Sequence, residues 1–133
     1  MTSAASSKFP KSRRLLKHAD FQRVYQSGRR QFTGNMTVFF LRRSRGTEGS
    51  GSGTEPRVGF TVGRALGGAV ERNRIKRRMR EAVRRSASAC DGPVDLVFNP
   101  RSSVLNLRFA ELVNEVTRAL QLAAQKARTM EES

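Results

Sequence analysis

One stretch of sequence is central to the prediction of the fold. It covers residues 68–89 and reads GAVERNRIKRRMREAVRRSASA. On a helical wheel, the apolar side chains of this stretch gather within one arc of roughly 100°. They are Ile75, Met79, Ala82 and Val83. This pattern predicts a helix whose narrow apolar stripe packs on a sheet. The polar side chains form two flanks: Asn73, Lys76, Arg77, Arg80 and Arg84 on one, and Arg74, Arg78 and Arg85 on the other.

Short segments rich in β-branched and aromatic residues lie on both sides of the basic stretch. Residues 57–62 alternate in polarity and residues 94–98 are mostly apolar, which predicts one strand before the helix and one after it. Residues 36–41 predict another strand, preceded by a short one near residues 30–33. Residues 44–55 contain a Gly-Ser repeat and are expected to form a flexible hairpin connection to the strand at 57–62.

A helix with an aromatic stripe is predicted over residues 21–27. Phe21, Val24 and Tyr25 stand at positions i, i+3 and i+4, so their side chains share one face. Asp20 is expected to be the polar residue at the N-terminus of this helix, and a start one turn earlier, near Leu16, is the alternative. Gly28 is expected to end the helix in the left-handed conformation.

A long core-packing helix is predicted towards the C-terminus, with Asn106 as its N-cap, because apolar residues recur there at helical spacing. The resulting order is αβββαβα, which indicates a small single-domain sandwich of the α+β class. The domain is expected to span residues 9–128, between disordered tails at residues 1–8 and 129–133.

Positive charge is concentrated in two segments of the chain. The 133 residues include 26 Lys and Arg against 11 Asp and Glu, a net charge of +15. Residues 8–30 hold eight basic residues and one acidic residue, and residues 64–85 hold nine basic and two acidic residues. A chain this basic repels itself unless a polyanion supplies counter-charge. A nucleic acid or an anionic membrane is therefore the expected type of partner.

Several other classes of protein are disfavoured by what the sequence lacks. No run approaches the ~18 to 20 apolar residues of a membrane span, and the N-terminal segment has no apolar signal core, so a cytoplasmic protein is expected. Cys90 and His18 are each the only residue of their type, which disfavours a disulfide framework or a zinc cluster. No nucleophile with its base and no carboxylate pair stands out, so no catalytic residue is assigned.

The basic stretch could be a solvated helix face, where runs of charge usually belong. A solvated face normally mixes signs, with acidic and basic residues paired four positions apart. Here only Glu71 and Glu81 offset eight basic residues between Arg72 and Arg85. Arginine, which can grip phosphate through two parallel hydrogen bonds, predominates. The pattern indicates RNA binding. DNA is a less favoured partner, because a helix held between two strands of one sheet does not protrude far enough from its domain to enter the major groove.

The same stretch resembles a known signature. Residues 68–81, centred on Arg72-Asn73-Arg74, closely resemble the signature of the bacterial ribonuclease P protein subunit. The resemblance covers about residues 9–125 in the right order. It includes Arg14-Leu15, Asp20-Phe21, residues 57–62 and residues 95–98.

The resemblance implies a function in which the protein is not the catalyst. In that family an RNA catalyses the cleavage, while the protein binds this RNA, supports Mg²⁺ binding and holds the 5′ leader of precursor tRNA in a cleft. The implied partners are the ribonuclease P catalytic RNA and precursor tRNA, with no membrane and no obligate protein partner. Mg²⁺ is the implied cofactor, used together with the RNA subunit. The resemblance also implies a left-handed βαβ crossover, against the usual right-handed preference.

The expected RNA-binding residues all lie on the signature helix: Arg72, Asn73, Arg74, Lys76, Arg77, Arg80 and Arg84. Arg84 is chosen by the helical wheel alone, and Arg74 lies on the opposite flank. The residues expected to bind the 5′ leader are Phe21, Tyr25, Phe39 and Arg64. Plain core packing is the alternative role for the three rings. Arg64 is followed by Ala65 where the family often has two adjacent lysines, so one leader or metal contact departs from the family pattern.

Two other functions stay open on the sequence. One is a ribosomal or RNA-chaperone protein without a nuclease partner. The other is a protein-only nuclease, which would need a cluster of carboxylates to hold metal ions and is disfavoured by the shortage of acidic residues in the basic segments.

Overall fold

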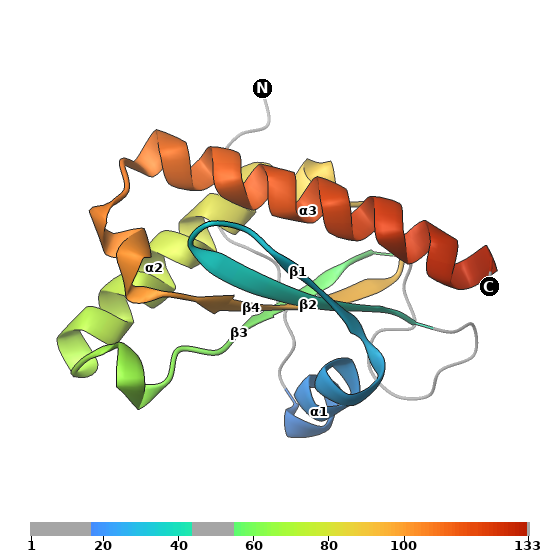
Figure 1. Cartoon of the computed structure of the whole chain (residues 1–133), viewed down its shortest axis with the longest axis horizontal. Helices are drawn as coiled ribbons and strands as arrows, with labels where there is room; N and C mark the ends of the chain where they lie inside the picture. The colour runs from blue at the N-terminus through green and yellow to red at the C-terminus, as the bar shows by residue number, and fades with distance from the viewer. Residues whose placement is uncertain (1–16, 44–54, 133) are drawn as a thin grey trace.

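The structure, a computed structural model, describes residues 17–43 and 55–132 (Figure 1). The expected tail at residues 1–8, most of the expected loop at 44–55 and the Arg14-Leu15 pair lie outside the described residues. The elements follow the predicted order. They are α1 (His18–Ser27), β1 (Arg29–Phe32), β2 (Met36–Arg42), β3 (Arg57–Phe60), the 3₁₀ turn η3 (Arg64–Leu66), α2 (Ala69–Ser86), η4 (Ala87–Ala89), β4 (Val94–Pro100), η5 (Ser102–Asn106) and α3 (Phe109–Glu132).

The four strands form one mixed sheet in the order β1-β2-β4-β3. β2 pairs antiparallel with both β1 and β4, whereas β3 pairs parallel with β4. The predicted hairpin between residues 36–41 and 57–62 is therefore wrong, because β4 lies between those strands. The position of β4 has a physical reason. Six of its seven residues are buried, as expected of a central strand covered on both faces.

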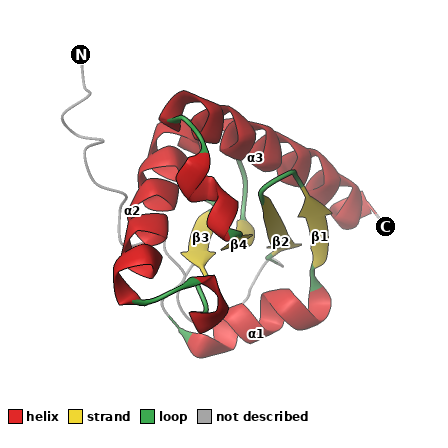
Figure 2. Ribbon diagram, turned by 60° about the vertical axis from the view of Figure 1, so that its left-hand side comes forward, coloured by secondary structure: helices red, strands yellow, loops and turns green. Residues whose placement is uncertain are grey.

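Helices cover both faces of the sheet (Figure 2). α2 and α3 pack on one face around a core that includes Phe40, Leu96, Phe98, Ile75 and Leu112, all fully buried. α1 packs on the other face over a smaller apolar cluster, made by Val24 and Val97 with Phe21, Phe39 and Leu41. The predicted α+β sandwich is confirmed.

The start of the sheet depends on a close approach at Gly28. The predicted left-handed conformation is wrong, since Gly28 is extended with φ −86°. A Cβ at this position would lie 2.4 Å from the Phe40 carbonyl oxygen and 2.5 Å from that of Val24. Gly28 is needed because α1 turns directly into β1 against the neighbouring strand. Asp20, expected at the N-terminus of α1, lies inside its first turn.

α3 is longer and starts later than expected. Its first residue is Phe109, because η5 occupies residues up to Asn106, the expected N-cap. The Arg108 amide donates instead to Glu111 Oε1 at 3.0 Å, which satisfies one free amide at the helix start. At the other end α3 continues to Glu132, so the chain is helical where a tail from residue 129 was expected.

Candidate nucleic-acid interface

The apolar stripe of α2 anchors the helix as its sequence predicts. Ile75, Met79, Ala82 and Val83 are all buried against the core that α2 shares with α3 and the sheet. Gly68 precedes the first turn in an extended conformation, and Gly67 adopts φ 132°, a value that favours glycine. α2 is therefore fixed in rotation, so the structure determines which of its basic side chains face solvent.

One side of α2 presents basic groups without acidic partners. We call Arg72, Asn73, Lys76, Arg77 and Arg80 the basic flank. Asn73, Arg77 and Arg80 are exposed, while Arg72 and Lys76 are half-buried. Within residues 17–43 and 55–132, no carboxylate lies within 4.0 Å of the four cations. Because their charge is uncompensated, these side chains are available to an external polyanion.

Glu81 interrupts the positive surface further along α2. Its carboxylate pairs with Arg84 and accepts from Arg85 Nε at 3.1 Å. Partial burial would raise the pKa of Glu81, but the hydrogen bonds from Arg85 and Arg84 outweigh it and leave the pKa below its usual value. Arg84, an expected RNA contact, is thus partly neutralised within its own helix.

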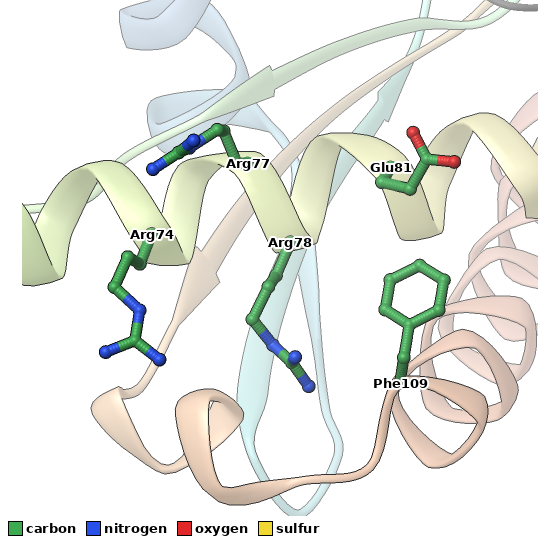
Figure 3. Close-up of a pocket in the computed structure, with 5 residues that line it drawn as sticks. All are labelled: Arg74, Arg77, Arg78, Glu81 and Phe109. Carbon is green, nitrogen blue, oxygen red and sulfur yellow. The ribbon is translucent and has the colours of Figure 1, made fainter.

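The opposite flank of α2 faces the start of α3 across an open pocket of about 360 Å³ (Figure 3). Its lining residues are Arg74, Arg78, Glu81 and Phe109, together with Arg77 of the basic flank. Arg78 donates to the Val104 carbonyl oxygen at 3.2 Å and also to that of Leu107, so it braces η5 against α2. The guanidinium carbons of Arg78 and Arg85 lie 5.8 and 5.2 Å from the Phe109 ring centroid. The sequence predicts that Phe109 lies on the core face of its helix. Its contacts with the two guanidinium groups depend on tertiary packing and could not be predicted from the sequence.

A second candidate surface lies on the sheet face that α1 only partly covers. Tyr25 meets Phe39 edge to face, with ring centroids 4.9 Å apart and planes at 88°. The Tyr25 hydroxyl hydrogen-bonds with the Thr61 hydroxyl at 2.7 Å and donates to Asn99 Oδ1 at 3.1 Å. The ring is therefore fixed to β4 and to the end of β3 while 36% of the residue stays exposed. We call Tyr25 and Phe39 the aromatic platform.

The other two expected leader residues differ in their environments. Phe21 is half-buried and packs against Val24 and Val97, so it contributes to the packing of α1 on the sheet. Arg64 is exposed in η3, in the connection between β3 and α2, outside the apolar cluster under α1.

A buried ionic cluster holds α1 on this face of the sheet, and sequence reasoning missed it. Asp95, fully buried on β4, accepts from Arg57 Nε and Nη2 at 2.8 Å each and from Arg43 Nη1 at 2.6 Å. Asp20 of α1 lies 3.4 Å from Arg57 Nη2 and pairs with Arg23 at 2.7 Å. The hydrogen bond to Asp95 raises the pKa of Arg57 despite burial. Because Asp20 belongs to α1, this cluster helps to set the position of Tyr25.

Comparison with known proteins identifies the family. Residues 9–124 match the family model described as Ribonuclease P. The chain belongs to the ribonuclease P protein family. The ribonuclease P protein component of Finegoldia magna is 32% identical over 116 residues, covering 87% of this chain and 95% of the relative. That of Bartonella quintana is 38% identical and covers 81% of this chain and 80% of the relative.

Solved structures of ribonuclease P proteins share the fold. The Staphylococcus aureus protein, at 2.0 Å, superposes with a TM-score of 0.68 and 27% identity, covering 85% of this chain and 96% of that one. The Thermotoga maritima protein gives a TM-score of 0.67 and 27% identity, covering 81% of this chain and 94% of that one. The sequence signature and the three-dimensional fold therefore point to the same family.

Two further properties of the described residues bear on partners. No helix within them is both long and apolar enough to cross a membrane. No group of three or more His, Cys, Asp or Glu side chains within them comes together in a way that could hold a metal ion.

Proposed function

We propose that this chain is the protein subunit of ribonuclease P and acts in the cytoplasm, within the ribonucleoprotein that removes the 5′ leader from precursor tRNA. The observation that carries the proposal is the basic flank. In a chain of this family, a helix with fixed orientation presents cations that have no carboxylate partner among the described residues. In this proposal the RNA subunit performs the cleavage, and the protein binds that RNA and the substrate.

The basic flank is assigned to the catalytic RNA. Arginine and lysine side chains that neutralise phosphates release condensed counterions, which supplies most of the affinity of a basic surface for RNA. The flank runs along α2 from Arg72 to Arg80, so successive phosphates of a folded RNA can be contacted by one rigid element. Arg74 lies in the pocket on the other side of α2 and is assigned a peripheral RNA contact.

The aromatic platform is assigned to the 5′ leader. A base stacked on an aromatic side chain gains about 1–3 kcal/mol whatever its identity, which suits a substrate set with varied leader sequences. Tyr25 fits this role because its hydroxyl is already bonded within the protein, so the ring is held in place before RNA binds. Phe39 packs against the Tyr25 ring edge to face. Arg64 is assigned to a phosphate of the same RNA strand.

Mg²⁺ is assigned to the RNA subunit in this proposal. The described residues gather no group of three or more carboxylates for the ion, and Asp95 and Glu81 are engaged in ion pairs with arginines. The contribution of the protein to metal binding is then indirect. Its cations reduce repulsion between phosphates, so the RNA folds and binds substrate at lower Mg²⁺.

Reconstitution tests the proposed function directly. The protein is mixed with ribonuclease P RNA and precursor tRNA at low Mg²⁺, and release of the 5′ leader is measured. We expect cleavage to be faster than with RNA alone. No stimulation would contradict the proposal and favour a ribosomal or RNA-chaperone role, whereas cleavage without the RNA subunit would indicate a protein-only nuclease.

The platform is tested by comparing two substitutions at one position. Tyr25→Ala removes the ring, whereas Tyr25→Phe keeps the ring and removes only the hydroxyl bonded to Thr61 and Asn99. In the reconstituted holoenzyme, we expect Tyr25→Ala to weaken binding of precursor tRNA about tenfold, as for loss of one stacking contact. Binding of mature tRNA should change little. Tyr25→Phe keeps the ring but loses the hydrogen bonds that hold it, so it should weaken precursor binding much less than Tyr25→Ala. Equal losses for precursor and mature tRNA would contradict the assignment.

A further inference from the structure

The sheet face that carries the aromatic platform continues onto β1. In the register of the sheet, Arg30 is opposite Phe39 and Phe32 is opposite Thr37, which is itself opposite Asn99 of β4. Residues opposite one another in an antiparallel pair project to the same face. Arg30 and Phe32 therefore lie on the same face as Phe39, one strand further from α1.

The side chain of Phe32 is exposed to solvent, although it is large and apolar. Within the described part of the chain, only three large apolar residues are classed as exposed, and Phe32, at 55%, is one of them. Its ring lies 5.3 Å from the guanidinium carbon of Arg30, so a cation already stands over it. An exposed ring therefore lies beside an arginine that is itself opposite Phe39, a member of the aromatic platform.

β1 is held firmly from its other face, which makes this surface rigid. Gln31 bonds to Lys126 of α3, and in the following turn Thr33 bonds to Glu115. The same Glu115 carboxylate accepts from the Asn35 amide at 2.7 Å and from Asn35 Nδ2 at 2.8 Å. Phe32 is thus presented by a strand whose opposite side is tied to α3, so its ring needs little ordering when a ligand binds.

We propose that Arg30 and Phe32 form an additional binding position for one unpaired nucleotide, which extends the aromatic platform onto β1. This proposal rests on the proposed function, since the nucleotide belongs to the leader that the platform holds. Phe32 and Phe39 are diagonal neighbours on adjacent strands, with side chains roughly 7–8 Å apart, a gap that one nucleotide of an extended strand can bridge. The ring of Phe32 stacks on the base, and Arg30 contacts the base or its phosphate.

The charge of β1 favours RNA over a protein strand as the occupant. β1 is an edge strand, and edge strands can pair with another chain. Arg29 and Arg30 stand side by side on it, and no carboxylate of the described residues lies within 4.0 Å of either. Adjacent uncompensated cations disfavour pairing of a second strand and attract a phosphate backbone.

The test uses the holoenzyme and precursor tRNAs that carry one abasic nucleotide at successive leader positions. Phe32→Ala is expected to weaken binding of the intact precursor about tenfold and leave binding of mature tRNA unchanged. One abasic position should weaken wild-type binding to the same extent and have no further effect in Phe32→Ala. Phe32→Tyr serves as the control that keeps the ring, and Arg30→Gln should weaken precursor binding and reduce its salt dependence.

The outcomes separate this proposal from the proposed function. If Tyr25→Ala impairs leader binding but Phe32→Ala does not, the extension onto β1 is overturned and the platform stands. If the effects of Phe32→Ala and of every abasic position add independently, Phe32 contacts no leader base and the proposal is likewise overturned. If neither Tyr25→Ala nor Phe32→Ala distinguishes precursor from mature tRNA, the leader assignment itself fails. Because Phe32 is exposed, its variants should unfold at the temperature of the wild type.

Discussion

Two groups of basic side chains in the described part of this protein have opposite surroundings. Under α1, Arg43 and Arg57 are buried and share the carboxylate of Asp95. On α2, the cations of the basic flank lie in or near solvent, and no described carboxylate pairs with them. Each of these cations adds one charge to the sum behind the net charge of +15, yet only those of the second group can offer their charge to a partner.

This difference indicates that a binding surface for an anion is identified by cations without carboxylate partners, and not by the number of charges. A buried guanidinium whose carboxylate partner is removed is strongly destabilising, because the desolvated charge has no compensation. An exposed guanidinium without a partner costs little free energy in the free protein. It gains a favourable interaction when a phosphate binds. The first group should therefore influence folding, and the second should influence RNA affinity and its salt dependence.

The largest effect should come from breaking the buried group at its centre. Asp95→Asn leaves Arg43 and Arg57 buried without the negative charge that both share, and we expect the free energy of unfolding to fall by about 3–5 kcal/mol. Urea denaturation measures this change. Asp91→Asn, four residues earlier and exposed, is the matched control and should stay within about 0.5 kcal/mol of the wild type. A loss for Asp95→Asn as small as that of the control would show that the cluster is not stabilising.

A carboxylate held only by neutral donors should give an intermediate effect that depends on pH. Burial would raise the pKa of Glu115, but hydrogen bonds from Asn35 and Thr33 lower it below its ordinary value of 4.5. A group with a lowered pKa stabilises the fold above its unfolded-state pKa, and this contribution is lost as pH falls through the folded-state pKa. We expect Glu115→Gln to cost about 2 kcal/mol at pH 7 and progressively less below about pH 4.5. A cost that stays constant down to pH 2 would contradict this account.

The smallest effect should come from removing the carboxylate that pairs with two arginines of α2. Glu81→Gln removes the carboxylate that engages Arg84 and Arg85, so less of the positive charge in this part of α2 is compensated when RNA binds. We expect affinity for ribonuclease P RNA to rise about twofold to fivefold, with a steeper salt dependence. Filter binding at several salt concentrations measures both quantities. Glu71→Gln, which makes the same change of charge in the first turn of α2, is the control, and an equal rise for both variants would indicate a response to net charge alone.

Local patterns were enough to predict the elements and the orientation of α2. The apolar arc of Ile75, Met79, Ala82 and Val83 is buried as the helical wheel requires, and the order of helices and strands is confirmed. These features depend on residues a few positions apart, so the sequence contains the information directly.

Features that depend on distant residues were not predictable in this way. The placement of β4 between β2 and β3 reflects competition among strands for the most buried position, which no single segment reveals. The partners of Asp95 come from positions 38 and 52 residues away, and Phe32 reaches the platform only through the sheet register. Gly28 could be recognised as structurally important, but its extended conformation follows from the carbonyl oxygen of Phe40.

The salt dependence of RNA binding tests the central claim most directly, that the unpaired basic flank of α2 and not total charge binds the catalytic RNA. Two double variants lose the same charge: Lys76→Ala with Arg80→Ala on the flank, and Arg118→Ala with Arg128→Ala on the exposed side of α3. The logarithm of the binding constant for ribonuclease P RNA is measured against the logarithm of salt concentration. We expect the flank variant to flatten the slope by about 0.7–0.9 for each lost phosphate contact, and the α3 variant to keep the wild-type slope. Equal slopes for the two double variants would contradict the account.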